Sequence, residues 1–266
     1  MTRRLALITG ASAGIGAAFA RIYAGNGYDV ALTARRGEKL EALADEIKLR
    51  SGVETYTVEA DLADPDAVDQ ILAAIADQGR TVDALVNNAG YGVRGAYSAK
   101  PWETHQDFLQ VMTVAPCELA RKVLPAMASQ GFGRIINVAS VAGMVPGTPG
   151  STLYGPVKSF LIRFSQGLHN ENRDTGVHVS ALCPGFTYSE FHDVAGMREQ
   201  IRRSTPLWMW MGADEVAAAG YEAAEANRPV CTPGAPNIAV SALLKVLPEE
   251  WLMALMRTRR LRVLGR

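Results

Sequence analysis

The stretch Thr9-Gly10-Ala11-Ser12-Ala13-Gly14-Ile15-Gly16 lies between a short apolar run and a helical pattern. Gly10 permits a tight turn, Gly14 lets backbone approach a pyrophosphate, and Gly16 lets the following helix pack closely. The helix N-terminus then directs free N–H groups and the positive end of its dipole at the phosphates. Because the glycines lie between a first strand and a first helix, they predict a dinucleotide-binding turn. The alternative is an ordinary glycine-rich turn.

Outward from this turn, short apolar runs alternate with helical patterns. We expect strands at Leu5–Thr9, Val30–Thr33, Thr55–Val58, Ala84–Val86, Ile135–Val138, Val177–Leu182 and, last and short, Val230–Thr232. We expect helices at Ile15–Gly25, Glu38–Arg50, Asp66–Asp77, and about 115–130 and 154–173. Strands buried on both faces and alternating with helices predict an α/β fold with a doubly wound parallel sheet, a three-layer α/β/α arrangement of the Rossmann type. Because no linker or repeat interrupts this pattern, we expect residues 1–266 to form a single domain.

Composition argues against several functional classes. The 27 basic and 27 acidic residues cancel, so no net field indicates a nucleic-acid partner. Cys117, Cys183 and Cys231 lie far apart, which favours reduced thiols in the cytoplasm and predicts no metal site. The apolar run near the N-terminus is too short for a signal peptide, and no uncharged stretch reaches the ~18–20 residues of a membrane span. We therefore expect a soluble cytoplasmic protein.

The end of the second predicted strand indicates which nucleotide binds. An NAD site typically places an acid there for the ribose 2′-hydroxyl. Here the stretch is Thr33-Ala34-Arg35-Arg36, with no acid. The two guanidiniums, with Ser12 as a further hydroxyl donor, would bind the 2′-phosphate of NADP(H), and a charge-assisted pair contributes roughly 1.5–3 kcal/mol. The alternative is two solvated arginines at the start of a helix.

Three residues after the fifth predicted strand could perform acid–base chemistry. Ser140 follows that strand, and Tyr154 and Lys158 lie one helical turn apart on one face. A free phenol has a pKa near 10, and an ammonium ~4 Å away could lower that pKa by about 3 units. Alone, such a pair is typical of any surface helix. Together with the dinucleotide turn, it predicts Tyr154 as the proton donor or acceptor of an alcohol/ketone oxidoreductase.

These motifs together resemble the short-chain dehydrogenase/reductase family, in its compact single-domain branch. The similarity covers about residues 3–232 and includes the glycine turn, Asp61-Leu62, Asn87-Asn88-Ala89-Gly90, Ser140, Tyr154/Lys158 and Pro184-Gly185. It implies that NADP(H) is bound by Gly10, Ser12, Gly14, Ile15, Gly16, Arg35, Arg36, Asp61, Leu62, Asn87, Ala89, Gly90, Tyr154, Lys158, Pro184, Gly185, Thr187 and Ser189. It also implies that Ser140 binds the substrate oxygen, Tyr154 transfers the proton, and Lys158 binds the nicotinamide ribose.

The sequence departs from this family's pattern at one position. Members usually carry an asparagine in the helix before the fifth strand, which holds a water of the proton relay. That position falls on Met112, with Thr113 beside it. The hydroxyl of Thr113 could hold a water, whereas the thioether of Met112 could not. An NADP(H)-binding sensor or scaffold with little turnover is therefore the alternative to an enzyme.

The segment 186–212 has the position of the mobile lid that covers the substrate in this family. It contains the large apolar residues Phe186, Tyr188, Phe191, Trp208, Met209, Trp210 and Met211, and it is broken by Gly196, Pro206 and Gly212. We expect it to close over a bulky apolar substrate. The alternative is that these side chains pack on the core. Arg198, Arg202 and Arg203 could also face a charged substrate.

Residues 237–266 form a basic C-terminal extension beyond the family's usual plan. Trp251-Leu-Met-Ala-Leu-Met is followed by Arg257, Arg259, Arg260, Arg262 and Arg266, with no acid after Glu250. Such a segment could lie on an anionic membrane surface. We favour instead a terminal helix that packs on its own subunit or on a partner, with its arginines solvated.

The sequence as a whole predicts an NADP(H)-dependent oxidoreductase that interconverts a ketone or aldehyde and an alcohol on a bulky apolar small molecule. By the resemblance, the chain forms a homodimer or homotetramer through the long helices at about 115–130 and 154–173. Those helices carry the apolar residues Leu119, Val123, Leu161 and Phe164.

Overall fold

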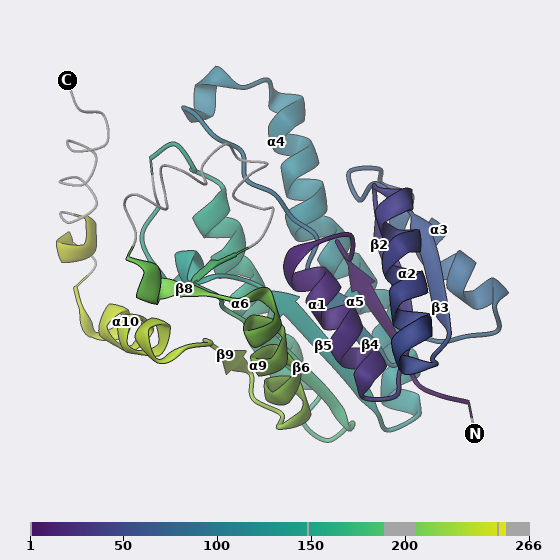
Figure 1. Ribbon diagram of the computed structural model, residues 1–266. Coiled ribbons are helices and arrows are strands. Elements are labelled where there is room, and N and C mark those ends of the chain that lie inside the picture. Colours follow the sequence, from purple (N-terminus) through teal and green to yellow (C-terminus); the bar gives the residue numbers. More distant parts are fainter. Residues whose placement is uncertain (1, 148, 189–205, 249, 254–266) are drawn as a thin grey trace.

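The computed structural model describes residues 2–147, 149–188, 206–248 and 250–253, and a seven-stranded parallel sheet lies at its centre (Figure 1). The strands are β1 (Leu5–Thr9), β2 (Asp29–Ala34), β3 (Thr55–Glu59), β4 (Ala84–Asn87), β5 (Gly133–Val138), β6 (Val177–Leu182) and β9 (Val230–Cys231). Across the sheet their order is β3-β2-β1-β4-β5-β6-β9. The winding direction therefore reverses between β1 and β4, which confirms the doubly wound arrangement and directs ligands to the carboxyl ends of these two strands.

Helices cover both faces of this sheet. They are α1 (Gly14–Gly25), α2 (Gly37–Ser51), α3 (Ala67–Asp77), α4 (Trp102–Leu109), α5 (Ala115–Ser129), α6 (Tyr154–Glu171), α9 (Ala213–Glu225) and α10 (Ala235–Val246). Ala6 and Ile8 of β1 pack in one apolar cluster with α1, α2 and α9, whereas Leu5 and Leu7 pack in a second cluster with α3 and α5. Successive side chains of a strand point to opposite faces. The fold is therefore the expected three-layer α/β/α arrangement.

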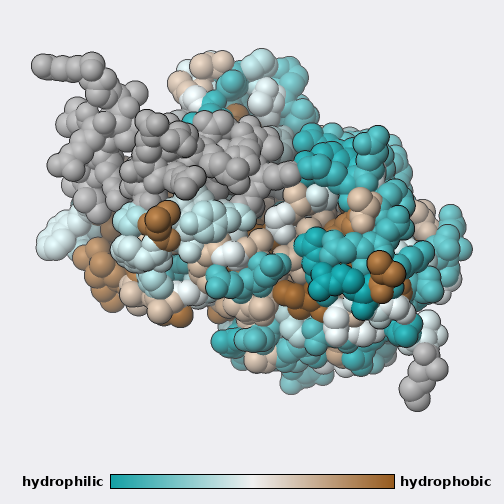
Figure 2. Space-filling view, in the orientation of Figure 1, coloured by the Kyte–Doolittle hydropathy of each residue, from teal (hydrophilic) through white to brown (hydrophobic). Residues whose placement is uncertain are grey.

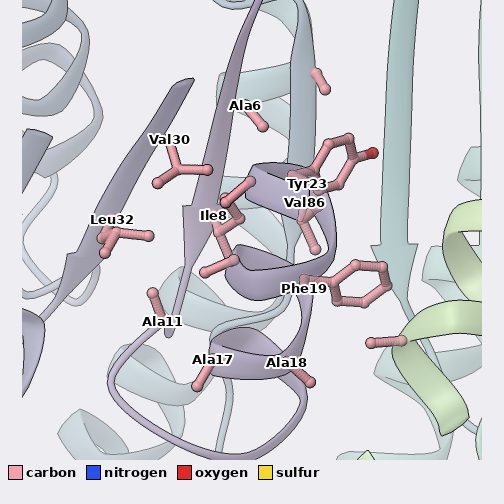
Figure 3. Close-up of a cluster of buried hydrophobic side chains, with 14 of the residues drawn as sticks. Ala6, Ile8, Ala11, Ala17, Ala18, Phe19, Tyr23, Val30, Leu32 and Val86 are labelled. Carbon is pink, nitrogen blue, oxygen red and sulfur yellow. The ribbon is translucent and has the colours of Figure 1, made fainter. Parts of the chain in front are cut away.

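The layer that holds α1 against the sheet is closely packed. Figure 3 shows Phe19 and Tyr23 of α1 beside Ala6 and Ile8 of β1 and Val86 of β4. All five side chains are fully buried. Burial of each large side chain stabilises the fold by about 1.5–3 kcal/mol. This packing fixes the start of α1 at the end of β1, where the glycine turn lies.

The long helix before β5 is interrupted. α4 ends at Leu109, a single π-helical turn spans Gln110–Val114, and α5 begins at Ala115. Sequence reasoning gave this helix bounds of about 115–130 and placed Met112 in it, but it foresaw neither α4 as a separate helix nor the π turn. Single π turns often occur at functional sites. Met112, the position of the expected relay asparagine, lies in this one.

The segment after β6 adds a small second sheet that the sequence did not predict. β7 (Phe186–Thr187) pairs in parallel with β8 (Trp210–Met211), and a 3₁₀ turn, η4 (Leu207–Met209), precedes β8. The predicted lid residues 189–205, which include Ser189, Phe191, Gly196 and three arginines, lie outside the described residues. Residues 254–266 of the basic extension also lie outside them.

Two further observations concern the described part of the chain. None of its helices is both long enough and apolar enough to cross a membrane. Cys117, Cys183 and Cys231 are free thiols, and the latter two are buried.

Candidate active site

The glycine turn lies against the end of β4. Gly10 and Gly14 have φ values of +65° and +55°, a region that favours glycine. A Cβ on Gly10 would lie 2.8 Å from Ala89 Cα, and one on Gly16 would lie 2.3 Å from the Gly10 carbonyl oxygen. The turn therefore has no room for side chains at either position.

The N-terminus of α1 has no side-chain cap. Ala13 occupies the N-cap position in an extended conformation, and its methyl side chain offers the first N–H groups of the helix no hydrogen-bond acceptor. The first N–H groups of a helix need partners from outside the helix. The first turn of α1 can therefore bind an anion such as a pyrophosphate. This arrangement fits the phosphate-binding role predicted for Gly10–Gly16.

A hydrogen-bonded clamp joins the glycine turn to β4. Thr9 Oγ1 accepts hydrogen bonds from the backbone N–H groups of Asn88 (2.9 Å) and Ala89 (3.0 Å), and it donates to the Val86 carbonyl (3.2 Å). Asn88 Nδ2 donates to the carbonyls of Thr9 (2.8 Å) and Gly10 (3.2 Å). Sequence reasoning assigned no role to Thr9 or to the side chain of Asn88, because these bonds join residues nearly 80 positions apart.

A buried polar chain runs behind the clamp. Asn87 Nδ2 donates to Asn137 Oδ1 (2.8 Å), and Asn137 Nδ2 donates to Ser165 Oγ (2.9 Å). These bonds link β4, β5 and α6. Asn87 Oδ1 is buried and has no hydrogen-bond partner among the described residues. An acceptor in that position can bind a donor group from a ligand or a water. Sequence reasoning missed Asn137 and Ser165.

The residues predicted to select the nucleotide lie together. Arg36 donates hydrogen bonds to Ser12 Oγ from Nη2 (2.7 Å) and Nε (3.1 Å). Arg35 Nη1 lies 3.7 Å from Asp61 Oδ2, and both side chains are exposed. A 2′-phosphate beside Ser12 would therefore meet Arg36 directly, whereas Arg35 already has an acidic neighbour. Leu62, which follows Asp61, is buried.

The three candidate catalytic residues come from β5 and α6. Ser140 lies after β5, where its Oγ accepts a hydrogen bond from Ala142 N (3.1 Å) and donates to the Pro184 carbonyl (3.3 Å). The side chains of Ser140 and Tyr154 are hydrogen-bonded. Lys158 lies one turn further along α6, with Nζ 5.7 Å from the centroid of the Tyr154 ring. The structure therefore brings Ser140, Tyr154 and Lys158 together.

The acid–base groups differ from the sequence expectation in one respect. Burial raises the pKa of Tyr154 to about 12, and the hydrogen bond with Ser140 offsets only part of that rise. Burial lowers the pKa of Lys158 to about 8. The expected lowering of the Tyr154 pKa by Lys158 is therefore not present in the chain alone. The physical reason is desolvation, which disfavours the charged form of both groups, while Lys158 Nζ donates to the Val138 carbonyl (2.6 Å).

The loop after β6 closes the same end of the sheet. A Cβ on Gly185 would lie 2.3 Å from Asn237 Oδ1, so α10 begins in direct contact with the Pro184-Gly185 turn. Thr187 Oγ1 donates to the Gly185 carbonyl (3.3 Å). Ser189, the remaining predicted cofactor residue of this loop, lies outside the described residues. Asn237 is a neighbour of the site that sequence reasoning missed.

The relay position is filled by a sulfur atom. Met112 is buried, and a Cβ on Gly90 would lie 2.6 Å from its Sδ. The hydroxyl of the adjacent Thr113 is buried without a hydrogen-bond partner among the described residues. A hydroxyl in that state can bind a water. The hydroxyl of Thr113, and not the thioether of Met112, therefore remains the candidate to hold a relay water.

A cavity lies beside Tyr154. Its lining residues are Val93, Gly95, Ala96, Tyr97, Lys100, His105, Phe108, Thr152, Leu153 and Tyr154. Buried His105 shares a hydrogen bond with the Tyr97 carbonyl through Nε2 (2.9 Å), and the two rings stack with centroids 4.5 Å apart. Sequence reasoning did not identify this loop, because it carries no motif of its own.

Comparisons with known proteins agree with this geometry. The chain matches the short chain dehydrogenase family model over residues 4–199. It is 34% identical over 230 residues to the NADP-dependent 3-hydroxy acid dehydrogenase YdfG of Salmonella typhi, with 85% of this chain and 84% of that protein covered.

Two solved structures have the same fold. A short-chain dehydrogenase from Sphingobium yanoikuyae in complex with NADPH is similar with a TM-score of 0.79 and 31% identity, covering 92% of this chain and 97% of that one. A bulky-bulky ketone specific alcohol dehydrogenase from Comamonas testosteroni has a TM-score of 0.75 and 26% identity, covering 100% and 96%. The sheet order, the glycine turn and the matched family model lead to one conclusion: the chain belongs to the short-chain dehydrogenase/reductase family, oxidoreductases that act on hydroxyl and carbonyl groups.

Proposed function

We propose that the chain is an NADP(H)-dependent oxidoreductase that interconverts a ketone or aldehyde and the corresponding alcohol. The observation that carries this proposal is the meeting of Ser140, Tyr154 and Lys158 at the carboxyl edge of the sheet, the edge where the glycine turn also lies. A turn of this kind holds a dinucleotide, and a phenol beside a buried ammonium can transfer a proton.

The residues present fit NADP(H). The uncapped N-terminus of α1 offers its N–H groups to the pyrophosphate, and Arg36 with Ser12 offers donors to the 2′-phosphate. Asn87, Ala89 and Gly90, after β4, and Pro184, Gly185, Thr187 and Ser189, after β6, would line the nicotinamide side. The similar Salmonella enzyme is named NADP-dependent, and the similar Sphingobium structure contains NADPH. Each supports the choice of NADP(H) over NAD(H).

The geometry of α6 and β5 supports the following catalytic roles. Tyr154, whose pKa is about 12, stays protonated at neutral pH and donates its proton to the carbonyl oxygen during reduction. Ser140 binds that same oxygen and the phenolate that remains. Bound NADPH would supply the hydride to the carbonyl carbon. Lys158 directs one N–H at Val138, which leaves two ammonium N–H donors for the ribose and for stabilising the phenolate. Oxidation of an alcohol uses the same groups in reverse.

We propose that the substrate is bulky and apolar. The rings of Phe186 and Tyr188 pack on Trp210 with centroids 5.5 Å and 5.0 Å apart, so these three side chains serve in part as packing. Trp208, in contrast, is 65% exposed on η4 and is free to contact a substrate. The similar Comamonas enzyme is described as specific for bulky-bulky ketones, which supports the same substrate class here.

Three further expectations complete the proposal. The chain is one domain over residues 1–266, in which 186–212 is a lid and 237–266 a basic extension. Two or four copies assemble through α5 and α6, where Phe160 is exposed and stacks on Phe164 with centroids 5.7 Å apart. The protein works in the cytoplasm, in keeping with its free thiols.

A nucleotide-binding sensor or scaffold is the second candidate, and buried Met112 in the relay position is the observation that favours it. The test is turnover of a panel of ketones and alcohols, followed by the absorbance of the reduced nicotinamide. We expect Tyr154→Phe to lower the chemical step by at least about 100-fold while NADPH still binds. Wild-type turnover in that variant would contradict the mechanism. Tight NADPH binding without turnover of any panel member in the wild type would favour the sensor.

A further inference from the structure

The cavity beside Tyr154 has a polar group that the proposed chemistry does not use. His105, on α4, is one of the side chains that line this cavity, and it is only 5% exposed. Its Nδ1 atom is buried and has no hydrogen-bond partner among the residues that the structure describes. Buried polar atoms of folded proteins are nearly always hydrogen-bonded. Nδ1 therefore needs a partner that the described residues do not supply.

The other ring nitrogen of His105 determines where the proton of the ring lies. Nε2 is 2.9 Å from the carbonyl oxygen of Tyr97, which belongs to the 3₁₀ turn η1 (Tyr97–Ala99). Because a carbonyl oxygen only accepts hydrogen bonds, Nε2 carries the proton and donates it. In a neutral imidazole the second nitrogen is then an acceptor. The partner of Nδ1 must therefore be a hydrogen-bond donor, such as a hydroxyl.

Aromatic neighbours hold the His105 ring in this orientation. The ring stacks on that of Tyr97 with centroids 4.5 Å apart and an interplanar angle of 21°, and the Trp102 ring lies 6.4 Å away. Figure 2 shows hydrophilic and hydrophobic residues mixed on the surface where η1 and α4 lie in Figure 1, whereas His105 itself is buried. Turning the ring over would break the bond to the Tyr97 carbonyl, so the acceptor stays at Nδ1.

A second side chain of the cavity complements this acceptor. Among the described residues that line the cavity, Lys100 is the only one with a formal charge, and none is Asp or Glu. Its side chain passes close to another lining residue, since a Cβ on Gly95 would lie 3.8 Å from Lys100 Cε. An ammonium only donates hydrogen bonds, whereas the neutral Nδ1 only accepts them. A hydroxyl group does both and therefore fits the two residues together.

We propose that the substrate carries a second hydroxyl, apart from the oxygen that reacts at Tyr154, and that His105 recognises it. This hydroxyl donates to Nδ1 of His105, and its oxygen accepts from the ammonium of Lys100. Val93 and Phe108 give the same cavity apolar walls, so the rest of the molecule is apolar, as proposed above. His105 and Lys100 thus determine specificity and take no part in the chemical step. The inference rests on the proposed function, because it requires a carbonyl or alcohol substrate at Tyr154.

The first test compares ketones that differ only in the second hydroxyl. Benzophenone and its meta- and para-hydroxy derivatives are titrated calorimetrically into the wild type saturated with NADP⁺, which has no hydride to transfer. We expect a hydroxy derivative to bind about tenfold to a hundredfold more tightly than benzophenone, because the parent ketone leaves a buried acceptor unpaired. Equal affinities would overturn the proposal. Tighter binding of the para-carboxy derivative than of both hydroxy derivatives would overturn it too, since Nδ1 would then be a donor.

This measurement distinguishes the inference from the proposed function, because it needs no turnover. A hydroxyl preference in binding, with no reduction of any ketone by NADPH, would leave the inference standing and contradict the proposed chemistry. Reduction of these ketones without any hydroxyl preference would do the reverse.

Two substitutions of His105 separate the roles of its two nitrogens. The amide of glutamine reaches about as far as Nε2, so His105→Gln keeps a donor for the Tyr97 carbonyl and removes the acceptor at Nδ1. The amide of asparagine reaches about as far as Nδ1, so His105→Asn keeps an acceptor there and loses the bond to Tyr97. We expect the two classes of ketone to bind equally in His105→Gln, and part of the hydroxyl preference to persist in His105→Asn. The opposite order would overturn the assignment of Nδ1 to the substrate.

Matched controls complete the experiment. Lys100→Met should reduce the hydroxyl preference by a smaller factor, roughly threefold, because the exposed ammonium also bonds to water. Lys48→Met, at an exposed position on α2, should leave the preference unchanged. So should His169→Gln on α6, where a histidine Nδ1 is likewise buried without a partner among the described residues. An unchanged melting temperature checks that each variant folds. Equal weakening of every ketone in His105→Gln, with the preference retained, would show that Nδ1 does not contact the substrate.

Discussion

The nucleotide side and the substrate side of the crevice differ in what determines their shape. On the nucleotide side, the backbones of the glycine turn and the end of β4 touch, and Thr9 and Asn88 bond the two together. On the substrate side, η4 exposes large side chains such as Trp208. A change on the nucleotide side should therefore affect every reaction of the enzyme. A change on the substrate side should affect only the choice of substrate.

The largest effect is expected at the closest backbone contact. Gly16→Ala places a Cβ where the Gly10 carbonyl lies 2.3 Å away, so the turn must open. Overpacking of this kind costs about 1–3 kcal/mol, and we expect NADPH to bind up to about 100-fold more weakly in isothermal titration. Gly25→Ala in the same helix is the control, because its Cβ would meet nothing within 4 Å. Equal affinities in the two variants would mean that the close contact does not shape the nucleotide site.

Nucleotide selection should respond to the arginines after β2. Arg35→Ala with Arg36→Ala should remove most of the preference for NADPH over NADH, which we place at about tenfold to a hundredfold. Arg36→Ala alone should remove more of this preference than Arg35→Ala alone, because Arg35 already pairs with Asp61. Arg50→Ala, an exposed arginine of α2, is the control. Equal dissociation constants for NADPH and NADH in the wild type would contradict the assignment.

Lys158, between the two sides, predicts a pH dependence of folding. Its pKa is about 8 in the folded chain and 10.5 in the unfolded one. Below pH 8 the folded state must hold a buried ammonium, which lowers the free energy of unfolding. As the pH rises from 8 to 10.5, the unfolded state retains a proton that the folded state has released, so stability increases.

We expect urea unfolding of the cofactor-free protein to show a gain of roughly 2 kcal/mol over this pH interval. Lys158→Met should flatten the profile, whereas Lys48→Met, at an exposed position on α2, should not. A wild-type profile that is flat or falls over the interval would show that burial does not penalise this ammonium.

The smallest effect is expected on the substrate side. Trp208→Ala should weaken the binding of bulky apolar ketones by roughly three- to tenfold, because burying part of one tryptophan side chain contributes about 1 kcal/mol to binding. Small ketones and NADPH should be nearly unaffected. Trp210→Ala should instead lower stability, since its ring packs on Phe186 and Tyr188. The measurement is the Michaelis constant of the wild type and of Trp208→Ala for matched pairs of large and small ketones. Equal changes for both sizes in Trp208→Ala would exclude a contact with bulky substrates.

Sequence reasoning succeeded where local pattern and backbone geometry coincide. The seven strands of the central sheet were predicted within two residues of their observed ends, because each is a short apolar run between turn residues. The glycine turn was predicted because glycine best meets the positive φ values at Gly10 and Gly14 and the lack of space at Gly10 and Gly16. The helical spacing of Tyr154 and Lys158 likewise fixed their common face.

Features that depend on distant contacts could not be predicted in this way. Asn137 looks like an ordinary strand residue until β4 places Asn87 beside it. Asn237 becomes a neighbour of the site through its contact with Gly185, more than 50 residues earlier. The π turn at Gln110–Val114 has no local signal such as glycine or an internal proline. In the chain alone the pKa of Tyr154 is raised rather than lowered, because spacing reveals a charged neighbour but not the extent of burial.

The missing cap at Ala13 links nucleotide supply to the lifetime of the protein. A serine, threonine or aspartate at a helix start typically adds about 1 kcal/mol, and α1 forgoes that contribution. The phosphates of a bound nucleotide would take the place of the cap, because they would accept hydrogen bonds from the first N–H groups of α1. A nucleotide present at about 100 times its dissociation constant adds about 2.7 kcal/mol to the free energy of unfolding. We therefore expect proteases to clear the chain faster in cells depleted of the nucleotide than in cells that are rich in it.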